Sequence, residues 1–149
     1  MYRRIFSLLM LTALFAGIPH VSTAGRKADI EIANRVAQWQ IDNFGKYISS
    51  KSGTRRDQNW VNGTLYRGMV VWGETSGYKP CEDFVREIGR RTGWSMDTRP
   101  YHADDICVGQ AYLLLYEKYR DPAMLAPVKE RADLVVDHPA KTQLHIKAK

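Results

Sequence analysis

The sequence of 149 residues contains only two cysteines, Cys81 and Cys107, and neither has a C-x-x-C partner. A zinc site built on cysteine is therefore excluded. The four histidines show no metal-ligand spacing, and His102 with a carboxylate two residues later is weak evidence, so we predict no metal. The two thiols could pair in an oxidising compartment or stay free, because the sequence does not place their Cα atoms within bridging distance.

Signatures of several other site classes are also missing. The chain has no serine-nucleophile motif, and its glycines form no phosphate-binding loop. Basic residues and aromatic residues do not alternate along one stripe, so we predict no nucleic-acid binding. The formal net charge of +6 is too small to identify a partner by itself.

The chain has one long apolar run, residues 5–18, and it lies at the N-terminus. Two arginines precede the run, and Pro19 and small residues ending at Ala24 follow it. This layout is typical of a secretory signal peptide, and the run is short for a membrane span. We predict a signal peptide over 1–24, a domain over 25–149, no stable membrane insertion after cleavage, and a periplasmic or secreted bacterial protein. An N-terminal membrane anchor is the open alternative.

The rest of the chain predicts helices throughout. Apolar residues recur at helical spacing, Gly45 and Gly77 stand where C-terminal caps belong, and Pro80 and Pro122 lie in first turns. We place a loop over 47–59. The predicted helices cover about 29–44, 60–75, 80–91, 104–119 and 122–137.

The second and fourth of these helices are apolar, whereas the third and fifth are amphipathic. This alternation favours stacked helical hairpins with one helix of each pair inside, although a helical solenoid would show the same pattern. In the third helix we expect Val85 and Ile88 to face the core and Glu82 to face solvent. Gly63, Gly68 and Gly73 in the second helix are expected to let another backbone or a ligand come close.

The segment 101–110 places two adjacent carboxylates at the start of the apolar fourth helix. Asp105 shares a helical stripe with Gly109, which would leave space beside the carboxylate, so we predict that Asp105 faces a pocket. The helix dipole lowers its pKa, which favours a charged partner or hydrogen-bond acceptor over a proton donor. Asp104 is predicted to cap the helix, and capping by both acids stays open. Gln110 could bind a hydroxyl-rich ligand.

Aromatic residues stand near the ends of the predicted loops. Trp60 and Trp94 lie at loop–helix junctions, where an indole could stack on a sugar ring. Trp72 lies in mid-helix and is predicted to be a core residue.

Two segments, 60–74 (WVNGTLYRGMVVWGE) and 101–110 (YHADDICVGQ), resemble the unsaturated rhamnogalacturonyl and glucuronyl hydrolases of glycoside hydrolase families 88 and 105. The run 115–122 (LYEKYRDP) fits as well, and the resemblance covers about 32–144. It implies an all-α fold, with helical hairpins that form part of an (α/α)6 toroid. It further implies removal of 4,5-unsaturated uronic acid from the non-reducing end of lyase-generated oligosaccharides of the rhamnogalacturonan or pectin type.

The resemblance also implies a mechanism and a site. The C4=C5 bond is protonated, water adds at C5, and the hemiketal collapses and releases the sugar, with no metal or organic cofactor. One pocket aspartate maps to the catalytic pair Asp105 and Asp104, with Asp105 favoured. Substrate binding is assigned to Trp60, Asn62, Tyr66, Trp94, His102 and Gln110.

The family's principal acid/base aspartate is expected in a Trp-x-x-Cys-Asp-like segment after the fifth helix. Lys149 precedes such a segment, so the resemblance implies the N-terminal part of the enzyme. The alternative is a non-catalytic helical-hairpin protein that binds carbohydrate or serves as an interaction scaffold.

About five helices are fewer than half of a twelve-helix ring, and open inner helices would expose a large apolar face. We therefore expect the isolated chain to aggregate or to fold poorly. Size-exclusion chromatography and a thermal melt followed by circular dichroism check this. Cooperative unfolding of a soluble monomer would contradict it.

Overall fold

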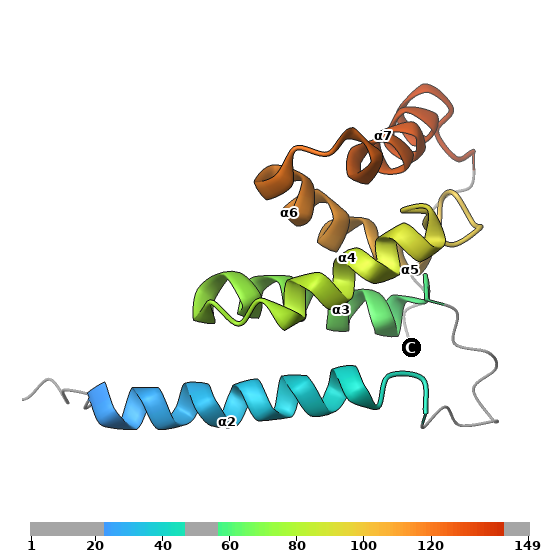
Figure 1. The fold of residues 1–149 in the computed structure, drawn as a ribbon. Coiled ribbons are helices and arrows are strands. Elements are labelled where there is room, and N and C mark those ends of the chain that lie inside the picture. Colours follow the sequence, from blue (N-terminus) through green and yellow to red (C-terminus); the bar gives the residue numbers. More distant parts are fainter. Residues whose placement is uncertain (1–22, 47–56, 142–149) are drawn as a thin grey trace, which may run out of the picture. The chain divides into compact units, whose positions relative to one another are not determined.

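The computed structural model describes residues 23–46 and 57–141, and every regular element in these ranges is a helix. The chain divides into two units, Met1–Ala33 and Asn34–Lys149, and the account below concerns the second. The predicted signal peptide, apart from its last two residues, and most of the predicted loop over 47–59 lie outside the described residues. The all-α class is confirmed. The helices are α2 (Thr23–Asp42), α3 (Trp60–Ser76), α4 (Pro80–Thr92), α5 (Ala103–Ile106), α6 (Gly109–Tyr119) and α7 (Pro122–Asp137) (Figure 1).

Side-chain caps and a C-terminal glycine mark the ends of the helices. The Asn59 side chain accepts a hydrogen bond from the Val61 amide at 3.0 Å and so caps α3, while Asp121 caps α7 in the same way through Ala123. Gly77 ends α3 in the left-handed conformation, with φ of 75°. The predicted bounds of α3, α4 and α7 are therefore confirmed to within a residue. Within the described ranges, no helix has the length and apolar content needed to cross a bilayer.

Two helical hairpins make up most of the second unit (Figure 1). Helix α3 packs against α4, α6 packs against α7, and the two hairpins meet through α3 and α6. The predicted hairpin packing of apolar and amphipathic helices is confirmed. The last part of α2 joins the same unit, since Trp72 donates to Asn34 at 2.9 Å and Tyr78 donates to Gln38 at 2.7 Å.

The core lies between the hairpins and is formed by large side chains with less than 2% exposure. Each such aliphatic side chain contributes about 1.5–3 kcal/mol through removal from water. Trp72, predicted to be a core residue, is only partly buried and packs against this core. The fully buried side chains are Tyr66, Tyr112, Ile88, Leu115, Met124, Val85, Val108 and Cys81.

The predicted fourth helix is wrong in one respect, because it is two helices, α5 and α6, separated at Cys107 and Val108. Backbone hydrogen bonds between residues three positions apart in the sequence span the break, as in a 3₁₀ turn. In one of them the Gln110 amide donates to the Cys107 carbonyl at 3.2 Å. A Cβ atom on Gly63 would lie 2.9 Å from the Val108 nitrogen, so only glycine lets α3 approach this point. The close-approach prediction is confirmed at Gly63 and wrong at Gly68, which has nothing within 4 Å.

The prediction that Glu82 faces solvent is also wrong, since the residue is 2% exposed. The Lys118 ammonium donates to its two carboxylate oxygens at 2.6 and 2.8 Å, and the Tyr119 hydroxyl donates at 2.6 Å. Burial raises the pKa of Glu82, but these hydrogen bonds outweigh it and leave the pKa below its usual value. Glu82 therefore ties α4 to the end of α6. Gly73 makes room for it, because a Cβ there would lie 2.8 Å from the Glu82 side chain.

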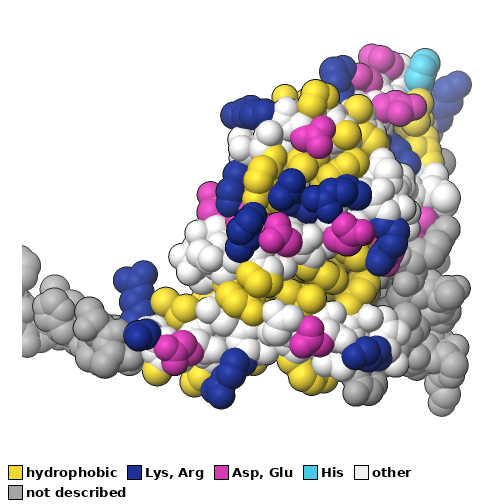
Figure 2. Space-filling view, in the orientation of Figure 1, with side chains coloured by type: hydrophobic (Ala, Val, Ile, Leu, Met, Phe, Trp, Pro, Cys, Tyr) yellow, Lys and Arg dark blue, Asp and Glu magenta, His cyan; other side chains and the backbone are white. Residues whose placement is uncertain are grey.

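Several large apolar side chains remain on the surface, among Lys, Arg, Asp and Glu side chains (Figure 2). Val136 is 76% exposed, and Leu113 on α6 is 39% exposed. The apolar helix α6 is therefore not enclosed on every side. One side of α6, through Ala111, Tyr112 and Leu115, is buried.

Gly89 and Gly68 offer a matched pair of helical glycines for a stability test. A Cβ on Gly89 would lie 2.2 Å from the Trp94 ring, so Gly89→Ala is expected to destabilise the fold by about 1–3 kcal/mol through overpacking. Gly68→Ala meets open space and is expected to stabilise by about 0.5–1 kcal/mol. Urea unfolding at low protein concentration, followed by circular dichroism, compares the two. Equal midpoints would contradict the Gly89–Trp94 contact.

Candidate functional site

Residues 94–102 form an irregular segment that leaves α4 and folds against α5. Trp94 starts it with a positive φ of 57°, which a non-glycine residue rarely adopts. The Ser95 hydroxyl donates to the Thr92 carbonyl at 2.7 Å, and the Asp97 amide donates to the Asp105 carbonyl at 2.9 Å. The segment is therefore attached at both ends, to α4 and to α5.

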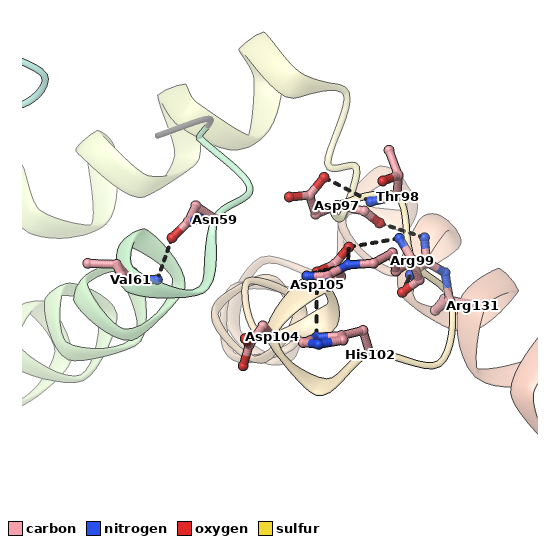
Figure 3. Close-up of polar contacts among 9 residues, drawn as sticks. All are labelled: Asn59, Val61, Asp97, Thr98, Arg99, His102, Asp104, Asp105 and Arg131. Atoms are coloured by element: carbon pink, nitrogen blue, oxygen red, sulfur yellow. Dashed lines mark hydrogen bonds and ion pairs between the residues drawn. The ribbon is translucent and has the colours of Figure 1, made fainter. Parts of the chain in front are cut away.

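Asp105 is the buried centre of this region, with 3% exposure (Figure 3). The Arg99 guanidinium donates through Nε to both carboxylate oxygens, at 3.1 and 3.0 Å, and through Nη2 to Oδ1 at 2.5 Å. The Arg99 amide donates to Oδ2 at 2.8 Å. Three N–H groups of Arg99 thus meet the carboxylate, and the single Nε–H is shared between its two oxygens. In this arrangement Arg99 occupies both carboxylate oxygens of Asp105.

These contacts fix the ionisation of Asp105. The side-chain hydrogen bonds from Arg99 hold the pKa of Asp105 at about 2, against the opposing effect of its burial. The carboxylate is therefore charged near neutral pH and cannot serve as a proton donor there. The sequence interpretation reached the same ionisation state through the helix dipole, but the physical cause is Arg99, since α5 has only four residues.

Arg131 on α7 holds the same segment from the other side (Figure 3). Its Nη2 donates to the Asp97 carbonyl at 2.9 Å, and its Nη1 donates to the Arg99 carbonyl at 3.3 Å. We call Asp97, Arg99, Asp105 and Arg131 the clamp. It joins α5, the irregular segment and α7, and neither arginine belongs to a sequence motif that would have revealed its role.

His102 and Asp104 lie beside the clamp with exposed side chains, at 43% and 49%. His102 Nδ1 is 3.7 Å from the Asp105 carboxylate and 3.8 Å from that of Asp104, and it makes no hydrogen bond with the described residues. The prediction that Asp104 caps the helix is wrong: His102 occupies the N-cap of α5, without a side-chain cap bond. The exposed acid is thus Asp104 and the buried acid is Asp105.

The predicted space between Asp105 and Gly109 does not exist. The break before Gly109 puts the two residues on different helices. A Cβ on Gly109 would lie 3.0 Å from the Met96 sulfur and 3.5 Å from Val128. Gly109 therefore serves the packing of α6 against α7 and the irregular segment.

The remaining predicted site residues fall into two groups. Tyr66, Trp94 and Asn62 are buried, at 0%, 5% and 8% exposure. The Trp94 ring packs edge-on against Tyr112, with centroids 5.1 Å apart, so the expected open stacking face on Trp94 is absent. Trp60 and Gln110 are exposed and remain accessible to a ligand. Of the predicted set, the structure brings together His102, Asp104 and Asp105, and their roles toward a ligand stay predictions.

A groove of about 430 Å³ lies between the irregular segment and α7. Its lining mixes hydroxyl, charged and apolar side chains, among them Ser95, Thr98, Arg131 and Leu134. In the part of the chain that the structure describes, no group of three or more His, Cys, Asp or Glu side chains could hold a metal ion.

Comparison with known proteins identifies a family and a relative of this chain. The family model of Glycosyl Hydrolase Family 88 matches residues 32–148. An "Unsaturated 3S-rhamnoglycuronyl hydrolase" from Alteromonas sp. (strain LOR) is 30% identical over 120 residues. That alignment covers 77% of this chain and 29% of the relative, so the chain spans less than a third of the relative's length. No solved structure matches.

The two neighbouring acids provide a matched test of the clamp. Asp105→Asn removes a buried charge that Arg99 satisfies, so it is expected to lower the urea midpoint at pH 7, whereas the exposed Asp104→Asn leaves it unchanged. Because the folded-state pKa of Asp105 is depressed, its stabilisation is present above its ordinary pKa and is lost as pH falls from about 4 to about 2. Asp105→Asn should therefore weaken the dependence of the midpoint on pH in that window. Equal midpoints for both variants at pH 7 would contradict the clamp.

Proposed function

Because the chain belongs to glycosyl hydrolase family 88, we propose that it removes 4,5-unsaturated uronic acid from the non-reducing end of lyase-generated oligosaccharides. The observation that carries this proposal is the family match over 32–148, which includes both motif segments. The hairpins α3–α4 and α6–α7 are of the kind that form an (α/α)6 toroid, the fold of this family.

We propose an oligosaccharide of the rhamnogalacturonan or pectin type, in which the uronic acid is joined to rhamnose. The name of the Alteromonas relative, a rhamnoglycuronyl hydrolase, also joins rhamnose to a uronyl unit and so supports a uronyl–rhamnose linkage. The positive net charge of the chain favours an acidic saccharide in general. We place the protein in the periplasm or outside the cell, on the layout of its first 24 residues.

The proposed reaction is the addition of water across the C4=C5 bond. A proton is added at C4 and a hydroxyl group at C5, and the resulting hemiketal opens and releases the sugar. Asp105 is charged and both of its carboxylate oxygens are occupied by Arg99, so it does not supply this proton. The side chains of Asp104 and His102, 49% and 43% exposed, are accessible to a saccharide, and we assign them to substrate binding and orientation.

The assay follows the ultraviolet absorbance of the unsaturated uronyl group. The chain is produced together with any sequence that its gene encodes after Lys149, and it is incubated with unsaturated disaccharides in which the uronyl unit is joined to rhamnose or to an amino sugar. The absorbance is expected to fall with the rhamnose-linked substrate. The saturated disaccharide serves as control. Asp104→Asn is expected to lower kcat/KM about 10–100-fold because a positioned polar contact is lost.

The alternative functions give different results in the same experiment. If the absorbance falls with none of the unsaturated uronides, the hydrolase function is rejected for this protein. Saccharide binding without any loss, measured by calorimetry, would favour the carbohydrate-binding protein that is its main competitor.

A further inference from the structure

We propose that the exposed face of α3 is a docking surface for a second copy of this chain, which packs on it antiparallel about a two-fold axis. We call this face the open face. Its residues are all exposed, and their spacing of three and four places them on one side of the helix. The open face consists of Thr64, Arg67, Gly68, Val71 and Glu74. The proposal concerns association of the chain and does not depend on the proposed reaction.

The middle of the open face is small and apolar, as close packing of two helices requires. Gly68 has nothing within 4 Å of the position of a Cβ atom, so no contact among the described residues accounts for a glycine there. A mid-helix glycine costs about 0.5–1 kcal/mol relative to alanine, but it lets a second backbone come close. Val71, one turn later, is 39% exposed. The Thr64 hydroxyl already donates to the Trp60 carbonyl at 2.8 Å and therefore needs no partner from a neighbouring helix.

The two charged residues of the open face are placed to pair between two copies. Arg67 and Glu74 are exposed, and neither belongs to an ion pair among the described residues. They stand two turns apart, about 10 Å along the helix axis. A two-fold axis midway between them, beside Val71, places Arg67 of each copy opposite Glu74 of the other. Because the same contact occurs twice in a two-fold pair, the dimer gains two ion pairs.

An acidic groove of about 360 Å³ between α3 and α6 adds to this charge complementarity. It borders the open face, because Glu74 belongs to both. One of its carboxylates, that of Glu82, is compensated by the Lys118 ammonium at 2.6 Å, which leaves two acids and a net negative charge. The guanidinium of a second copy's Arg67 therefore meets a groove of opposite charge. The groove is lined by Val70, Glu74, Glu82, Leu114, Glu117 and Lys118.

The composition of the open face favours a second copy over other occupants. In a two-fold contact the same patch meets itself, so each group must find its complement within that patch. The open face meets this condition, since it combines a cation, an acid and a small apolar centre on one stripe. A uronate saccharide is a poorer fit, because Glu74 and Glu117 would repel its carboxylate. A two-fold contact also closes at two copies, which limits further association.

The experiment is a charge-reversal cycle on the protein, produced with any sequence that its gene encodes after Lys149. Sedimentation velocity at low salt, over a range of protein concentrations, measures the dimer dissociation constant. Arg67→Glu and Glu74→Arg each create two like-charge pairs across the contact, and each is expected to raise that constant about 100-fold. The double variant Arg67→Glu/Glu74→Arg restores both pairs in the opposite sense and is expected to return to within about 10-fold of wild type.

A matched control changes the charge elsewhere. Arg90→Glu alters the net charge by the same amount as Arg67→Glu, but Arg90 lies on α4, 53% exposed, with a partner Glu87 that is 65% exposed. It is expected to leave the dissociation constant within about twofold, because exposed ion pairs contribute little. Since dimerisation includes ion pairs at the edge of the contact, high salt is expected to weaken the wild-type dimer.

Recovery in the double variant separates a direct contact from loss of structure, and circular dichroism checks that each variant is helical. If one single variant does not fold, the other single variant and the double variant decide. A monomeric wild type would overturn the proposal, as would larger aggregates or a dimer that both reversals leave intact. Lowered kcat/KM in Arg67→Glu at unchanged mass would assign the open face to the saccharide instead. A dimeric wild type without turnover rejects the proposed function alone.

Discussion

A buried carboxylate needs hydrogen-bond donors, and this constraint shapes the region around Asp105. The side chain lies on a helix of four residues, too short to supply the donors itself. The irregular segment therefore folds back over α5 and provides both the guanidinium and the amide of Arg99. Arg131 then satisfies the carbonyl groups that the segment leaves open. The positions of His102 and Asp104 follow from this arrangement.

The parts of the fold that depend on residues close together in the sequence could be predicted from it. Pro122 in the first turn of α7 and Gly77 after the last turn of α3 are local features, and they predicted these two helix ends. The break between α5 and α6 was missed because no residue in that stretch marks it, and it lies where α3 comes close at Gly63, more than forty residues earlier in the chain. A helical stripe drawn through Asp105 and Gly109 assumed one continuous helix, so the predicted space between these two residues was wrong.

The burial of charged residues also depends on partners that are distant in the sequence, and it could not be predicted. Periodicity put Glu82 on the polar face of its helix, and the side chain is nevertheless buried because Lys118 and Tyr119 reach it from α6. Asp105 is a second case, with its donor in a segment that has no regular structure. Pattern reasoning assigns a charge to solvent by default, and it cannot see a partner that the tertiary fold supplies. The resemblance identified the glycoside hydrolase family correctly without revealing which of the two acids is exposed.

The ion pair of Glu82 also constrains the order in which the protein can assemble during synthesis. Glu82 emerges from the ribosome 36 residues before its partner Lys118. Until α6 is made, close packing of α3 on α4 would bury the carboxylate without a cation, at a cost of several kcal/mol. The native surroundings of Glu82 are therefore complete only after α6 has been synthesised and has supplied Lys118 and Tyr119.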